Sequence, residues 1–110
     1  MRSEQTTLLR GTLGLLILKS LVGSEKHGLG ISHRIQQIKG GAFVLKPGLL
    51  FPALHEMGEE GWPSSGWGKS ASNRRANYYQ LTKAGQKQLG TETKRWDRIA
   101  WAIGRALETT

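Results

Sequence analysis

The chain has 110 residues, no cysteine and a formal net charge of +8, with a pI near 10.3. A chain of this length forms one domain with a modest core, and the lack of cysteine excludes disulfides, a catalytic thiol and thiolate metal sites. The positive balance favours an anionic partner, with nucleic acid first and a membrane surface second.

The first predicted element is a helix over about residues 8–22, because apolar side chains recur there at helical spacing. They form two stripes, so the helix needs cover on two sides, from its own domain and from a partner chain. Leu15 and Leu18 belong to the second stripe. Arg10 and Lys19 interrupt the run, which is too short to span a bilayer, and we expect a cytoplasmic protein.

A second helix is predicted from three isoleucines at i, i+4 and i+7 spacing: Ile31, Ile35 and Ile38. It should end at Gly40 and Gly41. The stretch AFVLKPG is expected to be extended and to end in a turn, because Pro47 restrains Lys46.

A third helix is expected from about Leu49 to Glu60, with Pro52 in its first turn, where a missing N–H does no harm. Its buried stripe is Leu50, Leu54 and Met57. The side chains expected on the exposed face are Leu49, Ala53 and His55.

Residues 62–67 and 76–81 are predicted to be two short strands around a loop. The stretch from residue 66 to 89 holds five Lys or Arg and no Asp or Glu, and the loop itself carries Lys69, Arg74 and Arg75. Thr82 is the expected N-cap of a last helix that continues or restarts after Gly90 to about residue 107.

Three helices followed by a basic hairpin is the order of a winged helix-turn-helix, a mainly α fold with a small β-hairpin. In that layout the third helix enters the major groove and the hairpin loop lies along the DNA backbone. The wing cations would then contact phosphate. Tyr78 and Tyr79 would anchor the wing in the core. The alternative is that a tyrosine hydroxyl contacts a phosphate. The acidic far end of the third helix should point away from DNA.

The last helix carries a long apolar stripe: Trp96, Ile99, Ala100, Ile103 and Leu107. Such a stripe is typical of a dimer interface, where aromatic side chains contribute strongly. Trp96 could instead line an effector pocket between subunits. We therefore expect a DNA-binding part over residues 1–85 and a dimerisation helix over residues 86–110.

Four segments resemble the PadR family of bacterial transcriptional regulators, and together they cover most of the chain: LLRGTLGLLIL, HGLGISHRI, GLLFPALHEMGEEGW and NRRANYYQLTKAGQKQL. The third and fourth are the specific ones. The resemblance is to the short form with a single C-terminal dimerisation helix. It implies a dimeric winged-helix repressor on a pseudo-palindromic operator of double-stranded DNA, in some members released by a small, often aromatic or otherwise apolar effector.

With the resemblance, two sets of site residues are predicted. The DNA-binding set is Lys46, Gly48, Leu49, Phe51, Pro52, His55, Lys69, Arg74, Arg75 and Tyr78. The set for the dimer interface or effector is Leu15, Leu18, Trp96, Ile99, Ala100, Ile103 and Leu107. The chain departs from the family pattern at Leu29, Leu49 and Pro63, where Tyr, Ser or Thr, and a β-branched residue are usual, and these departures would affect the tightness of DNA binding more than the fold.

An enzyme is not expected, because the chain has no GxSxG motif and no plausible nucleophile–base pair. The three histidines, His27, His33 and His55, lack metal-ligand spacing, so no metal or other cofactor is predicted. Three alternatives stay open: a winged-helix regulator of another family, a protein-interaction module whose wing meets an acidic protein, and a small basic membrane-surface protein.

Overall fold

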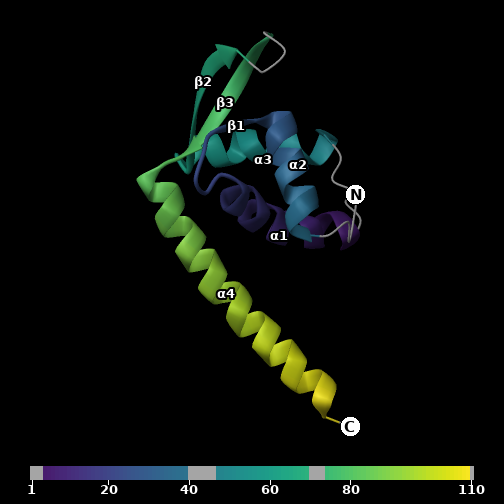
Figure 1. The fold of residues 1–110 in the computed structure, drawn as a ribbon. Helices are drawn as coiled ribbons and strands as arrows, with labels where there is room; N and C mark the ends of the chain where they lie inside the picture. The colour runs from purple at the N-terminus through teal and green to yellow at the C-terminus, as the bar shows by residue number, and fades with distance from the viewer. Residues whose placement is uncertain (1–3, 40–46, 70–73, 110) are drawn as a thin grey trace.

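The computed structural model describes residues 4–39, 47–69 and 74–109, and within these ranges the side chains from residue 12 on, except those of Lys39 and Pro47 (Figure 1). The elements in chain order are α1 (Glu4–Ser20), β1 (Lys26–His27), α2 (Gly28–Lys39), α3 (Pro47–Glu59), β2 (Pro63–Lys69), β3 (Arg75–Leu81) and α4 (Lys83–Glu108). The first three helices and the sheet form a body, and α4 runs away from it (Figure 1). The predicted mainly helical fold with a small sheet is confirmed, and its arrangement is that of a winged helix.

The core lies where α1, α2 and α3 meet, and it is built from the buried stripes of these helices. Nine apolar side chains form it: Leu13, Ile17, Leu18, Leu21, Ile31, Ile35, Leu50, Leu54 and Met57. The stripe predicted for the third helix is therefore confirmed. The predicted second helix is also present; Ile31 and Ile35 lie in the core, and Ile38, near the end of the helix, is 38% exposed.

The helix α3 starts earlier than predicted, at Pro47 rather than near Leu49. Pro47 and Gly48, which were expected in a turn, are therefore helical. Residues 42–46, expected to be extended, lie outside the described residues, as do Gly40 and Gly41. Pro52 consequently lies in the second turn, where the carbonyl of Gly48 loses its i to i+4 partner.

The end of α3 is set by Gly61, whose φ of 78° is the left-handed conformation that glycine adopts without strain. The N–H of Trp62 donates to the carbonyl of Met57 at 3.2 Å, and the N–H of Gly61 donates to that of Gly58 at 3.1 Å. This pair of hydrogen bonds is the Schellman motif, which satisfies helix carbonyls that would otherwise lack donors. It turns the chain directly into β2.

The sheet is antiparallel, with strand order β1-β3-β2. The predicted hairpin is confirmed and is longer than expected, since β2 and β3 pair from Pro63 opposite Leu81 to Lys69 opposite Arg75. Pro63 occupies the first position of its strand, where a missing N–H is tolerated. The strand β1 was not predicted, because two residues carry no alternation that a sequence could show.

The start of α4 confirms Thr82 as its N-cap. The N–H of Gly85 donates to the Thr82 hydroxyl oxygen at 3.0 Å, and that hydroxyl lies 2.6 Å from the carbonyl oxygen of Gly61. Gly85 is buried against the carbonyl of Trp62, so close that a Cβ at this position could not fit without a backbone shift. The helix then continues through Gly90 without a break.

Candidate nucleic-acid interface

The exposed face of α3 is formed by Gly48, Phe51, Pro52 and His55. Phe51 is half exposed, and the inner edge of its ring covers Gly28, where an added Cβ would lie 2.7 Å from a ring carbon. His55 Nε2 lies 3.1 Å from an Oε1 of Glu59 one turn later, with both side chains in solvent. The structure thus gives α3 an open, partly aromatic face.

Two residues expected on that face are placed differently. Leu49 and Ala53 are partly buried and pack against the core. Both lie within one helical turn of the buried stripe, and their small or apolar side chains are drawn into the edge of the core. The prediction that they face outward was therefore wrong in part, while His55 is exposed as expected.

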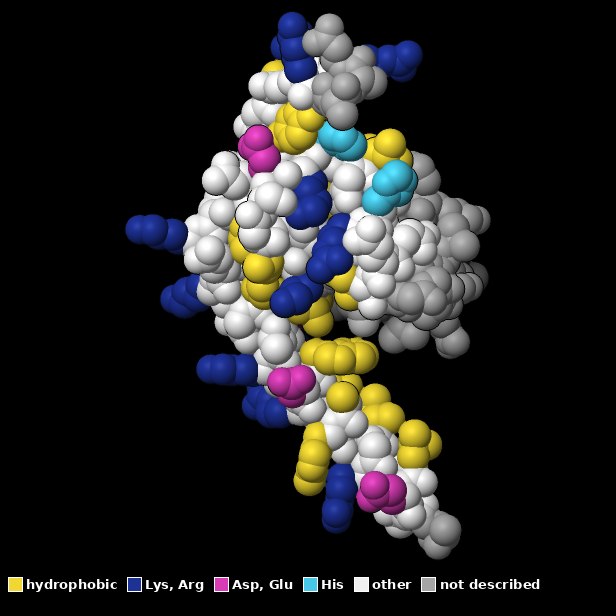
Figure 2. All heavy atoms as spheres, in the orientation of Figure 1, with side chains coloured by type: hydrophobic (Ala, Val, Ile, Leu, Met, Phe, Trp, Pro, Cys, Tyr) yellow, Lys and Arg dark blue, Asp and Glu magenta, His cyan; other side chains and the backbone are white. Residues whose placement is uncertain are grey.

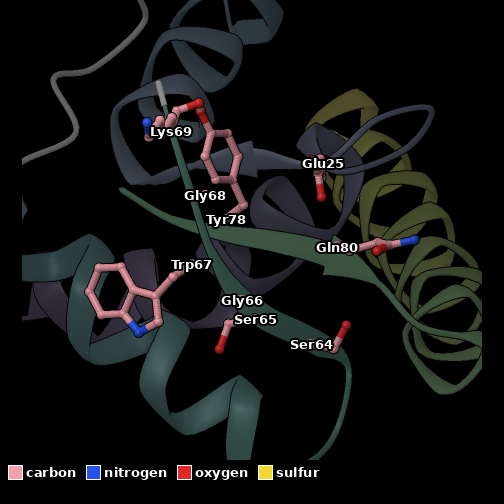
Figure 3. Close-up of a pocket in the computed structure, with 9 residues that line it drawn as sticks. All are labelled: Glu25, Ser64, Ser65, Gly66, Trp67, Gly68, Lys69, Tyr78 and Gln80. Carbon is pink, nitrogen blue, oxygen red and sulfur yellow. Dashed lines mark hydrogen bonds between the residues drawn. The ribbon is translucent and has the colours of Figure 1, made fainter. Parts of the chain in front are cut away.

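The hairpin formed by β2 and β3, here called the wing, has two different faces because side chains alternate along each strand. The face that borders α3, here called the inner face, carries Ser65 and Trp67 of β2 opposite Tyr79 and Asn77 of β3. Figure 3 shows the side chains of Trp67 and Tyr78 leaving the sheet on opposite sides.

Tyr78 stands on the outer face of the wing. Its ring covers Gly68, where a Cβ would lie 3.1 Å from two ring carbons, and meets the ring of His27 edge-on at 5.4 Å. Its hydroxyl donates to the carbonyl of Lys69 at 2.9 Å (Figure 3). Tyr78 is therefore a structural support of the wing, whereas Tyr79 packs against the core.

A trough of about 540 Å³ runs between α3 and the inner face of the wing. Phe51 and His55 line it from the helix, and Ser65, Asn77 and Tyr79 line it from the strands. The third helix and the wing therefore border one continuous surface, which is the arrangement needed to contact adjacent parts of one duplex.

The wing is the cationic end of this surface. Figure 2 shows Lys and Arg side chains at the far end of the hairpin, where Lys69, Arg74 and Arg75 are exposed. Residues 61–91 contain no Asp or Glu. The Arg75 guanidinium lies 4.4 Å from the centre of the Trp67 ring. Lys46 lies outside the described residues.

The helix α4 continues an apolar stripe beyond the body. Leu89 packs against the core, and the following positions of the same stripe are exposed: Trp96, Ile99, Ala100, Ile103 and Leu107. Figure 2 shows most of the hydrophobic side chains of α4 along one side, and Lys and Arg mainly along the other, together with one further hydrophobic side chain. The predicted stripe is thus uncovered in the single chain.

Of the two α1 residues predicted for the interface, Leu15 is partly buried and Leu18 is only 1% exposed. Leu18 belongs to the core of its own domain and has almost no exposed surface, so the prediction that it lies in the interface was wrong. The α1 helix contacts α2, α3 and α4, and Leu18 is part of the core that these contacts enclose.

Sequence reasoning placed Trp67 only at the end of a strand and did not predict its contact with Arg75. The signal was present in the alternation of Ser65 and Trp67, which puts the indole on the same face as Tyr79. Within the described ranges, no cluster of three His, Asp or Glu side chains has the geometry to hold a metal ion. Within the same ranges, no helix is long and apolar enough to cross a bilayer.

A winged helix with a cationic wing and an open third helix has the architecture of a DNA-binding domain. Residues 17–91 match the model of the Transcriptional regulator PadR-like family. The chain belongs to this family, which consists of regulators and not of enzymes.

Solved structures agree in fold along nearly the whole chain. A putative transcriptional regulator from Thermoplasma acidophilum is 27% identical, with 94% of this chain and 98% of that chain covered and a TM-score of 0.78. A PadR-like transcriptional regulator from Bacillus cereus is 21% identical, with 94% and 99% covered and a TM-score of 0.79. An uncharacterized protein of Lysinibacillus sphaericus is 21% identical over 94% of this chain and 95% of its own length.

Proposed function

We propose that this PadR-family regulator is a dimeric repressor that inserts α3 into the major groove and lays the wing along the flanking backbone. The observation that carries the proposal is the trough shared by α3 and the wing, which puts Phe51 and His55 beside the base of a cationic hairpin. A helix and a hairpin on one surface can follow a duplex from its major groove onto the adjacent phosphates.

The contacts divide by chemistry. Phe51, Pro52 and His55 would face base edges and sugars, with Gly48 allowing close approach of the α3 backbone. Lys69, Arg74 and Arg75 would neutralise phosphates, which supplies most of the sequence-independent affinity. Glu59 stands at the far end of α3 and would stay outside the duplex.

Dimerisation would use the exposed stripe of α4. Trp96, Ile99 and Ile103 lie in solvent in the single chain, and burying such a stripe against a second copy is the usual way to stabilise a long amphipathic helix. Two copies related by a two-fold axis would present their α3 helices to half-sites about 34 Å apart, one turn of the duplex. Residues 1–85 would then bind DNA and residues 86–110 would dimerise.

Repression and effector release are the finer parts of this proposal, and they rest on the family resemblance. A planar apolar effector would be recognised by stacking on Trp96, which is 44% exposed on the dimer stripe. The test is quenching of tryptophan fluorescence by planar aromatic compounds, which should be smaller in Trp96→Phe than in the wild type. A regulator of this kind would act where DNA is accessible, in the cytoplasm.

The decisive experiment measures binding to the duplex upstream of this protein's own gene at two salt concentrations, with excess random duplex as competitor. The proposal predicts a complex that survives the competitor, and a salt slope that falls by about 0.9 when Arg75 is changed to Ala. Equal loss to random duplex would contradict a sequence-specific repressor. Sedimentation equilibrium on the free protein tests the dimer.

A further inference from the structure

The indole of Trp67 is 65% exposed, although a tryptophan in a small domain usually has most of its surface covered. It lies on the inner face of the wing and is not among the side chains that pack against the core. The ring contacts a cation, since the Arg75 guanidinium lies 4.4 Å from the ring centre. The exposed indole and the wing arginine therefore form one unit.

The strand register explains how the two side chains meet. Trp67 stands directly opposite Asn77, and Arg75 lies two residues earlier on the same face, so the pair is a diagonal cross-strand neighbour. Arg75 begins β3 at the loop end of the hairpin, and its side chain is exposed to solvent. The stack on Trp67 turns the guanidinium back along the wing, toward the end of the hairpin that borders the trough.

We propose that Trp67 is a positioning residue that holds Arg75 ready for a phosphate of the DNA strand passing between α3 and the wing. This inference rests on the proposed function, because it concerns the same DNA surface. The ring occupies one face of the guanidinium and leaves the N–H groups at its edge free to donate to phosphate oxygens. Because the side chain is already ordered, binding loses less rotamer entropy.

Two other roles for Trp67 give different results. If Trp67 only stabilised the wing, or if it stacked on a base, Trp67→Ala would weaken DNA binding whether or not Arg75 is present. A positioning role makes the effect of Trp67 depend on Arg75. A double-mutant cycle therefore separates the positioning role from both others.

The probe is a random-sequence duplex, so no operator needs to be known. We expect Trp67→Ala to weaken binding about three-fold, the value of an exposed cation–π pair, and to leave the salt slope unchanged because the charge remains. Arg75→Ala should weaken binding further and reduce the slope by about 0.9. In the Arg75→Ala background, Trp67→Ala should have no further effect on binding. In the otherwise wild-type protein, Trp67→Phe should retain most of the affinity, because the aromatic ring remains. An equal Trp67→Ala effect in both backgrounds would overturn the inference.

A second measurement needs no DNA. The order parameter of the Arg75 side-chain Nε–H bond can be measured by ¹⁵N relaxation in the free protein. It should fall in Trp67→Ala. It should stay unchanged in Trp101→Ala, which removes a similarly exposed tryptophan from α4. Unchanged order of Arg75 in Trp67→Ala would overturn the inference even if the wing binds DNA. If the wild type fails to bind duplex while the order depends on Trp67, the proposed function fails, and so does the positioning role for DNA.

Discussion

The body and the outer half of α4 contain similar apolar residues, but these are buried in the body and exposed in α4. In the body, Ile17, Ile31 and Leu54 are buried by neighbours from the same chain. In α4, Trp96, Ile99 and Ile103 have the same helical spacing and remain in solvent. The difference teaches that an apolar stripe predicts burial but does not say whether the cover comes from the same chain or from another.

The largest expected effect comes from breaking the body. Leu54→Ala removes a fully buried side chain and should lower the free energy of unfolding by about 2–5 kcal/mol. Chemical denaturation measures it. The matched control is Leu29→Ala on the exposed side of α2, which should change stability by less than about 0.5 kcal/mol. Similar losses in both variants would mean that the described core does not carry the stability.

Next comes the junction between the two regions. Gly85→Ala puts a Cβ against the backbone carbonyl of Trp62, so the start of α4 must move, and we expect a loss of up to about 3 kcal/mol. Gly90→Ala is the control in the same helix. It has open space around it and should raise stability by up to about 1 kcal/mol, because alanine favours the helix. Thermal unfolding of the two variants should shift in opposite directions.

The outer half of α4 is tested with two tryptophans. Trp96 lies on the apolar stripe, whereas Trp101 is 69% exposed on the other side, with the Arg105 guanidinium 5.5 Å from its ring centre. Trp96→Ala should weaken the dimer about thirty-fold, as for an interface hot spot of about 2 kcal/mol. Trp101→Ala should leave the dimer constant within about two-fold. Sedimentation equilibrium measures the dimer dissociation constant of both variants. Equal changes in Trp96→Ala and Trp101→Ala would contradict the assignment of the stripe as the dimer interface.

The smallest effect concerns the cap that joins the wing to α4. Thr82→Ala removes the hydroxyl that accepts from Gly85 and donates to a carbonyl of the α3–β2 turn, and it should cost about 1 kcal/mol. Thr82→Ser keeps the hydroxyl and should recover most of this loss. If serine is as destabilising as alanine, packing of the threonine methyl group matters more than the cap.

Much of this fold could be predicted because its signals are local. Isoleucines at helical spacing predicted α2, the alternating residues before Leu81 predicted the hairpin, and Thr82 predicted the cap. The errors occurred where the decisive contact is distant in sequence. The strand β1 forms because Lys26 pairs with Tyr79. Two residues are too few to show a strand pattern, so this pairing with a distant segment could not be predicted.

The candidate site divides in the same way. The positive charge of the site was visible in the sequence, since all the charged residues of the wing stretch are cations. The set of DNA-binding residues was predicted with the help of the family resemblance. Which side chains point outward was visible only in part: His55 is exposed as predicted, but other positions differ. Leu49 and Ala53 were drawn to the core edge, and Trp67 was brought to Arg75 by the register of two strands. Side-chain direction depends on the phase of each element against its neighbours, and a shift of one residue reverses it in a strand.

The sequence by itself determined the class of this protein: its helices and hairpin in order, its basic wing and its long amphipathic last helix. These follow from periodicity, turn residues and charge, which act over a few neighbouring positions. The tertiary structure alone decided that Leu18 lies inside the body, that α3 and the wing share one trough, and that the stripe of α4 remains uncovered in one chain. Those outcomes depend on which surfaces meet, and burial is a property of contacts between distant segments.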